Sequence, residues 1–141
     1  IAYEMIHMAR IIPTDGRAHL PAHLRSWDGG SVGHWEGSTL VVDITNYNGR
    51  GWVATNAAAG HMRGVLQSDA FHAVERFTRV SATTIHYQVT IDDPKTYTRP
   101  WTFAIPLERA DDYRIYEYAC HEGNHAVENV LRGGRAADAA R

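Results

Sequence analysis

The chain has 141 residues, with 44% hydrophobic and 21% charged content, which argues against long disordered segments and predicts one domain with one core. Fourteen basic residues, of which Lys95 is the only lysine, stand against sixteen acidic ones and give a net charge of −2. No basic run is available to neutralise phosphates, so nucleic acid binding is not expected.

Apolar and polar residues alternate with a period of two through most of the chain, which is typical of antiparallel strands with one solvated face. At least six such strands at hairpin spacing predict an all-β fold, a lipocalin-like antiparallel barrel or sandwich. The expected strands cover residues 3–12, 34–35, 39–47, 71–80, 84–91, 97–107 and 113–119, with Glu36-Gly37-Ser38 as the turn of a hairpin.

The segments between these strands carry turn residues or have no clear period. Residues 17–33 predict a long loop, and the Ala/Gly-rich residues 52–66 predict an irregular excursion with at most a short helical turn. Within the strands, alternation places Leu40, Val42 and Ile44 on one face. It does the same for Ile85, Tyr87, Val89 and Ile91.

The last segment changes to a helical period. Asn124 is a good N-cap, and Gly133-Gly134 is expected to end the helix. The apolar stripe of this short helix is Ala126, Val127, Val130 and Leu131. We therefore expect a single β domain over residues 1–134, including the helix, and a frayed tail over residues 135–141. No apolar run is long enough for a membrane-spanning helix.

The sequence His121-Glu122-Gly123-Asn124-His125 matches the H-E-x-x-H pattern of zinc metalloproteases. That chemistry needs both histidines on one continuous helix, so that both imidazoles reach the same ion. Here a predicted strand runs into the motif, Gly123 disfavours a helix, and Asn124 prefers to cap one. The motif is therefore expected to join a strand end to a helix start, where the two histidines need not converge.

A strand end beside a helix N-terminus offers another kind of site. Its backbone N–H groups can activate a thiol or hold an anion, and Cys120, His121 and Glu122 are placed to use them. The alternative is structural: Cys120 alternates with Tyr118 and Tyr116 and would pack in the core, and His121 would cap the strand. With one cysteine no internal disulfide can form.

Ionisable residues in the middle of predicted strands indicate a polar pocket. His7, Glu75 and Glu117 share faces with apolar neighbours, and a buried lone charge is costly unless it is paired, protonated or lines a cavity. One arrangement brings His7, Glu75, Arg10 or Arg76 and the Cys120 corner to a shared pocket. The alternative is a set of ion pairs on the solvated face.

The chain's nine histidines and four tryptophans allow two further interpretations. His7 and His121, with the dispersed His61, His72, His86 and His125, could hold a divalent transition metal, although no spacing motif supports this. Trp27, Trp35, Trp52 and Trp101 could stack on a saccharide. For Trp35 and Trp101, a position in the core is the better expectation.

Several long motifs together resemble a large family of uncharacterised bacterial proteins. They are residues 33–43 (GHWEGSTLVVD), 75–80 (ERFTRV), 93–94 (DP), 98–101 (TRPW) and 116–124 (YEYACHEGN). Members of the family are abundant in soil bacteria, typically look secreted or periplasmic, and continue further N-terminally with an export signal. The resemblance implies an extracytoplasmic protein and the C-terminal part of a longer one, because the chain begins at Ile1 without a signal pattern. It implies no activity.

Two functions follow from these features. The first is an extracytoplasmic hydrolase or lyase acting on a small molecule or saccharide. In it Glu122, Glu75, His121 and Cys120 would be catalytic, His7 and His121 would bind a metal, and Arg10, Arg76 and Asn124 would hold the substrate. The second is a non-catalytic module that binds a ligand or assembles with copies of itself through strand edges.

Overall fold

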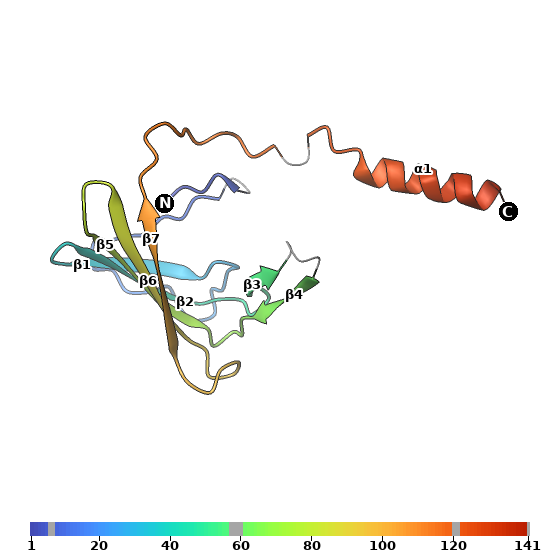
Figure 1. Ribbon diagram of the computed structural model, residues 1–141. Coiled ribbons are helices and arrows are strands. Elements are labelled where there is room, and N and C mark those ends of the chain that lie inside the picture. Colours follow the sequence, from blue (N-terminus) through green and yellow to red (C-terminus); the bar gives the residue numbers. More distant parts are fainter. Residues whose placement is uncertain (6–7, 57–60, 120–121, 141) are drawn as a thin grey trace. The chain divides into compact units, whose positions relative to one another are not determined.

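The computed structural model describes residues 1–5, 8–56, 61–119 and 122–140 (Figure 1). The chain divides into two compact units: Ile1 with residues 10–112, and residues 2–9 with residues 113–141. The described residues of the larger unit form seven β-strands, and those of the smaller unit include one α-helix.

Five of the strands form one antiparallel sheet in the order β1-β2-β5-β6-β7, and β3 and β4 form a separate hairpin (Figure 1). The prediction of a mostly β protein with an antiparallel sheet and one C-terminal helix is confirmed. The strands are β1 (Gly30–Glu36), β2 (Thr39–Thr45), β3 (Trp52–Asn56), β4 (His61–Leu66), β5 (His72–Arg79), β6 (Thr84–Asp92) and β7 (Trp101–Glu108).

The register of the sheet gives it one apolar and one polar face. Val42 lies opposite Glu75, Glu75 opposite Val89, and Val89 opposite Phe103, and directly opposed residues share a face. The same face carries Leu40, Ile44, Ala73, Phe77, Ile85, Tyr87, Ile91, Trp101, Ile105 and Leu107. The other face is mainly polar and includes Asp43, His72, Arg76, Gln88, Thr90 and Thr102. Both predicted sets of co-facial residues are therefore confirmed.

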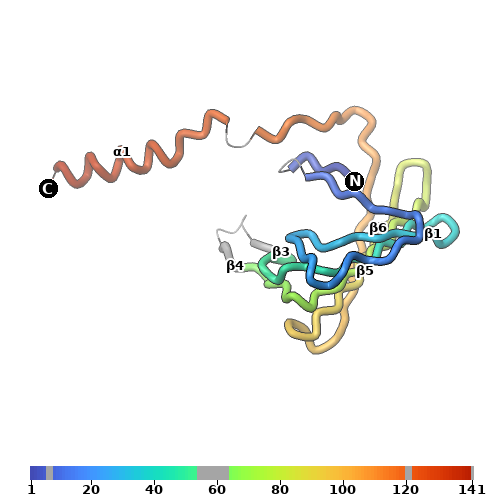
Figure 2. Tube along the Cα trace, turned by 180° about the vertical axis from the view of Figure 1, so that it is seen from behind, coloured from blue at the N-terminus to red at the C-terminus, as the bar shows by residue number. Residues whose placement is uncertain are grey.

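The core lies on the apolar face at one end of the sheet. Val42 and Ile44 of β2 are almost completely buried, and Tyr47 meets Phe71 edge to face with ring centroids 4.9 Å apart. The segment before β1 runs alongside β1 and β2 (Figure 2), where the Gly33 N–H donates to the Pro13 carbonyl at 2.8 Å. Ile12 of this segment packs against the core.

The predicted hairpin of β1 and β2 is confirmed, with a turn of two residues, Gly37 and Ser38, rather than the three expected. Gly37 has φ 59° at the first central position, the position where a type II′ turn has a positive φ. The twist of this turn type matches that of the strands, so Glu36 and Thr39 pair directly. The predicted loop over residues 17–33 is shorter than expected, since β1 begins at Gly30.

The prediction for residues 52–66 is wrong, because β3 and β4 pair as a hairpin where an irregular excursion was expected. Their alternation is weak, with Ala and Gly in place of larger side chains. The two ends of the excursion meet: the Gln67 N–H donates to the Gly51 carbonyl at 3.2 Å. A Cβ atom on Gly51 would lie 2.1 Å from the Gln67 side-chain amide nitrogen, so a larger residue here would force the Gln67 side chain to move.

Two predicted strands of the smaller unit are wrong. Residues 3–5 and 8–12 form no strand, although an isolated bridge joins Ala2 to Ala9, and residues 113–119 form no strand. Both segments alternate, but alternation makes a strand only where a neighbouring chain accepts its hydrogen bonds. Instead, the Tyr113 hydroxyl donates to the Glu4 carboxylate.

The C-terminal helix α1 spans Ala126–Ala139, beyond its predicted end at Gly133-Gly134. Glycine inside a helix costs about 1 kcal/mol relative to alanine, and Ala136, Ala137 and Ala139 are strong helix formers that continue it. The N-cap is His125 rather than Asn124, whose side-chain oxygen accepts the Ala126 N–H at 3.0 Å. No described helix is both long and apolar enough to span a bilayer.

Asp93 directly follows β6 and is fully buried. It connects the loop before β5 to the loop after β6. Its carboxylate accepts hydrogen bonds from the Ser68 N–H at 2.8 Å, the Ser68 hydroxyl at 2.5 Å, the Thr96 hydroxyl at 2.7 Å and the Lys95 N–H at 3.3 Å. Burial raises the pKa of Asp93, but these hydrogen bonds outweigh it and hold the pKa below its ordinary value of 3.8.

Replacing Asp93 by Asn is expected to lower the free energy of unfolding by about 1–3 kcal/mol at neutral pH, because an amide NH2 group would face hydrogen-bond donors. Urea denaturation measures the loss. Asp92→Asn, on the polar face one residue earlier, is the matched control and should change stability little. A similar loss in both variants would contradict this role of Asp93.

The advantage of the wild type over Asp93→Asn is expected to depend on pH. The pKa of Asp93 is lower in the folded chain than in the unfolded one, so the carboxylate stabilises the fold above about pH 3.8. This contribution is lost as the pH falls through the lowered folded pKa. Urea denaturation of both proteins between neutral pH and about pH 2 should show the difference shrinking, and a constant difference would contradict the prediction.

Candidate functional site

Glu75 lies in the middle of β5 on the apolar face of the sheet and is 6% exposed. Its register neighbours on that face are Val42 of β2 and Val89 of β6. The sequence predicts this position, since Glu75 alternates with Ala73 and Phe77. A carboxylate among aliphatic side chains requires polar partners.

Arg10 and Tyr87 supply those partners. The Arg10 guanidinium binds the carboxylate in bidentate fashion, with Nη1 3.0 Å from Oε1 and Nη2 2.6 Å from Oε2 of Glu75. The Tyr87 hydroxyl donates to Oε1 at 2.6 Å. Of the residues predicted to share a pocket, Arg10 and Glu75 therefore do meet. Both carboxylate oxygens are already bound, which makes the group an ion-paired connection between the N-terminal segment and the sheet.

Arg76, the other arginine considered for this pocket, lies on the opposite face. It follows Glu75 directly in β5, and its Nη2 contacts Oε2 of Glu36 at 2.6 Å among solvated side chains. Hydrogen bonds from Arg76 and His34 lower the pKa of the Glu36 carboxyl. Arg76 thus forms a surface ion pair, which was the alternative interpretation of these charges.

The remaining predicted site residues belong to the smaller unit or lie outside the described residues. Glu122 is exposed, and its N–H donates to the Ala119 carbonyl at 3.2 Å. Gly123 has φ 67°, and α1 begins after His125, so residues 122–124 are not part of a helix that could carry both histidines of the motif. The predicted roles of His7, Cys120 and His121 fall outside the described residues and stay predictions.

A histidine pair on the polar face was not predicted. Asp43 of β2 holds two imidazoles, with His19 Nε2 2.7 Å from Oδ1 and His72 Nε2 3.0 Å from Oδ2. Nothing in the sequence places His19, a loop residue, next to a strand. Among the described side chains no group of three His, Cys, Asp or Glu is arranged to hold a metal ion. The three residues instead fasten the loop before β1 to the sheet.

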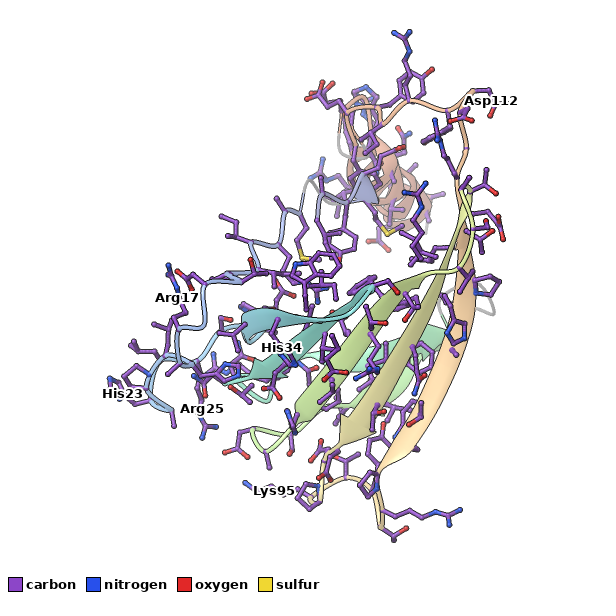
Figure 3. The ribbon with its side chains drawn as sticks, turned by 90° about the vertical axis from the view of Figure 1, so that its left-hand side faces the viewer. Arg17, His23, Arg25, His34, Lys95 and Asp112 are labelled. Carbon is purple, nitrogen blue, oxygen red and sulfur yellow. The ribbon has the colours of Figure 1, made fainter. Side chains whose placement is uncertain are left out.

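Asp69, in the turn before β5, also connects separate segments of the chain through ion pairs. Its carboxylate contacts Arg25 of the loop before β1 at 2.9 Å and also binds Lys95 of the turn between β6 and β7. Figure 3 shows Arg17, His23 and Arg25 along that loop and Lys95 at that turn. Hydrogen bonds from Lys95 and Arg25 lower the pKa of the Asp69 carboxyl. The charges of Arg25, Lys95 and Asp69 are therefore paired with one another, beside a small hollow of about 190 Å³ that Arg25, Asp69 and His72 help to line.

The apolar face contains a hollow of about 440 Å³. Strands β1, β2, β5, β6 and β7 all contribute to its wall, and Ser38 and Arg79 are its polar members. Trp35 is 63% exposed here, which corrects its predicted place in the core, whereas Trp101 does pack against the core. The apolar side chains of the wall are Ile1, Trp35, Leu40, Phe77, Ile85 and Leu107.

Sequence reasoning missed this hollow because it arises from the pairing of strands that are distant in the chain. Alternation did place Leu40 and Ile85 on the apolar faces of their strands. It could not show which part of that face the core leaves open. Comparisons with known proteins add no assignment: no family model, curated protein or solved structure matches the chain.

Arg10→Met and Glu75→Leu are each expected to lower the free energy of unfolding by about 3 kcal/mol, because each leaves a buried charge without its partner. The double variant should recover much of the summed loss, since two apolar side chains then replace the pair. Urea denaturation of the four proteins measures this coupling.

The pair Glu36 and Arg76 is the matched control, since its 2.6 Å contact is the same length but lies on the solvated face. Glu36→Gln and Arg76→Met should alter stability much less, because water solvates the remaining charge. Equal losses at the two pairs would show that burial is not the source of the effect.

Proposed function

We propose that the protein is a non-catalytic β module that binds a small apolar molecule in the hollow on the apolar face of its sheet. The observation that carries the proposal is the hollow itself, about 440 Å³ in volume and walled by side chains from all five strands of the sheet. Ligand sites typically enclose about 300–1,000 Å³ and are mostly apolar with a few polar groups.

The chemistry of the wall favours an apolar ligand over a saccharide. A sugar needs hydrogen-bond partners for its hydroxyl groups, whereas Ser38 and Arg79 are the polar side chains of the described wall. Trp35 could stack on a sugar ring, but Leu40, Ile85 and Leu107 around it would leave the hydroxyl groups without partners. A hydrocarbon chain or ring system meets no such cost.

The exposed apolar surface provides the driving force. Trp35 is 63% exposed, and Ile85 and Leu107 are 38% and 39% exposed, although all three point from the apolar face. Covering apolar surface contributes about 25 cal/mol per Å², so about 200 Å² would contribute about 5 kcal/mol before the entropy cost of binding. A ligand of this kind would therefore bind with moderate affinity.

An extracytoplasmic hydrolase or lyase is the second candidate. The observation that favours it is the buried Glu75 with the Tyr87 hydroxyl 2.6 Å from its carboxylate, a pair of groups used in acid–base chemistry. Arg10 also binds both oxygens of Glu75, so the carboxylate has no oxygen directed at a substrate. This arrangement supports a structural role for Glu75 and ranks the enzyme below the binding module.

We also propose how the five-stranded sheet is completed. A sandwich or barrel, in which a second layer covers the apolar face beside the hollow, is supported by Phe103 and Ile105 of β7, which lie outside the wall of the hollow and are 38% and 45% exposed on that face. Self-assembly by pairing along β7 is less favoured. β7 is an outer strand of the described sheet and contains Pro106, which has no N–H to donate to a further strand.

Trp35→Ala is expected to weaken binding of a neutral apolar dye such as N-phenylnaphthylamine by about tenfold, because it removes the largest apolar side chain of the wall. Titration followed by dye fluorescence measures the change. Trp27→Ala is the matched control, since Trp27 is 59% exposed but lies outside the wall. If the dye fails to bind the wild type, or binds both variants alike, the proposal is wrong.

A further inference from the structure

The apolar hollow adjoins a second, polar hollow of about 370 Å³ at the turn between β5 and β6. The two share Arg79, Ile85 and Leu107, so they are parts of one continuous surface. The second hollow adds hydroxyl groups of Ser81, Thr83 and Thr84. The proposed ligand site therefore has an apolar part and a polar part that meet at Arg79.

Arg79 is held in place by its own turn. Its Nε donates to the Ser81 carbonyl at 2.9 Å and its Nη2 donates to the Ala82 carbonyl at 3.2 Å. These acceptors are neutral, and within the described part of the chain no carboxylate lies in ion-pair range of Arg79. Among the described residues, the positive charge of the guanidinium is therefore not balanced by a carboxylate, while its orientation is restricted.

The polar hollow holds two other charged groups. Arg109 binds Asp111. Glu108 accepts a hydrogen bond at 3.0 Å from the neutral Thr84 hydroxyl, which does not balance its negative charge, but Glu108 lies outside the wall of the apolar hollow. Among the side chains that wall the apolar hollow, Arg79 is the charged one. A ligand whose body fills the apolar hollow would thus reach the Arg79 guanidinium at its end.

We infer that the ligand is a single-chain amphiphile with an anionic head group, its hydrocarbon tail against Trp35, Leu40 and Phe77 and its head at Arg79. This inference rests on the proposed binding function and names its ligand class. A guanidinium binds a carboxylate with two parallel N–H···O bonds, and the nearby Ser81 and Thr83 can offer a hydroxyl donor to the head. A cationic head would be repelled by Arg79, and a neutral one would gain less from it.

Three probes with the same tail test the inference on the wild-type protein: dodecanoate, dodecanol and dodecyltrimethylammonium, each below its micelle concentration. Displacement of the neutral dye measures their affinities. Dodecanoate is expected to bind about tenfold more tightly than dodecanol, as expected for a hydrogen bond to a charged group, and the ammonium compound more weakly than either. Equal affinities, or preference for the cation, would overturn the inference.

Variants then locate the head group. Arg79→Gln should reduce dodecanoate affinity about tenfold and dodecanol affinity much less, while Arg79→Lys should retain part of the preference. Arg109→Gln is the matched control, because Arg109 lies in the polar hollow but is bound to Asp111. Preference for dodecanoate that persists in Arg79→Gln would overturn the assignment of the head group to Arg79.

The outcomes separate this inference from the function on which it rests. If the dye and dodecanol bind but dodecanoate has no advantage, the apolar site exists and the anionic head is wrong. If neither the dye nor any of the three probes binds, the binding function fails as well. The three-probe comparison uses unmodified protein, so it does not depend on the folding of any variant.

Discussion

Directly opposed residues of an antiparallel sheet must point to the same side, and most features of this protein depend on that constraint. Once Val42, Glu75 and Val89 are aligned, their strands place nearly all aliphatic and aromatic side chains together. The core, the ion pair and the apolar hollow all lie on that side. A shift of one residue in the register of β5 would move Glu75 to water and Arg76 among the aliphatic side chains.

The same period of two explains which parts of the fold could be predicted. β2, β5 and β6 combine alternation with clear turns, so their extents and faces follow from the sequence alone. Residues 3–12 and 113–119 alternate too, but a strand also needs a partner chain, which a local pattern does not reveal. The hairpin of β3 and β4 shows the reverse case, in which pairing forms despite weak alternation.

The candidate site divides in the same way. The position of Glu75 on the apolar face was predictable, and so was its need for an ion-pair partner, a proton or a polar cavity, because a lone buried charge is costly. The sequence could exclude Arg76 as the partner, because it is adjacent to Glu75 in the strand and must point to the other face. It could not identify Arg10 as the partner. The apolar hollow, the His19 contact with Asp43 and the exposure of Trp35 depend on contacts between distant segments, and no local signal encodes them.

The buried ion pair also bears on how uniquely the chain folds. Aliphatic side chains would pack the centre of the sheet with fewer constraints, but Glu75 accepts hydrogen bonds only from donors placed at Arg10 and Tyr87. An alternative alignment of the N-terminal segment that separated Arg10 from Glu75 would leave a buried charge without its partner, which is strongly unfavourable. Because Ile12 follows Arg10 closely, this pair also positions the segment that covers the core.

The meeting of Gly51 with Gln67 has a consequence for how related proteins could diverge. β2 and β5 are neighbours in the sheet, so the hairpin between them is an insertion into a simple meander whose entry and exit touch. The entropy of closing such a loop rises only slowly with its length. Evolution, or an engineer, could therefore lengthen or replace this insertion, even with a whole extra domain, while the five-stranded framework keeps its alignment.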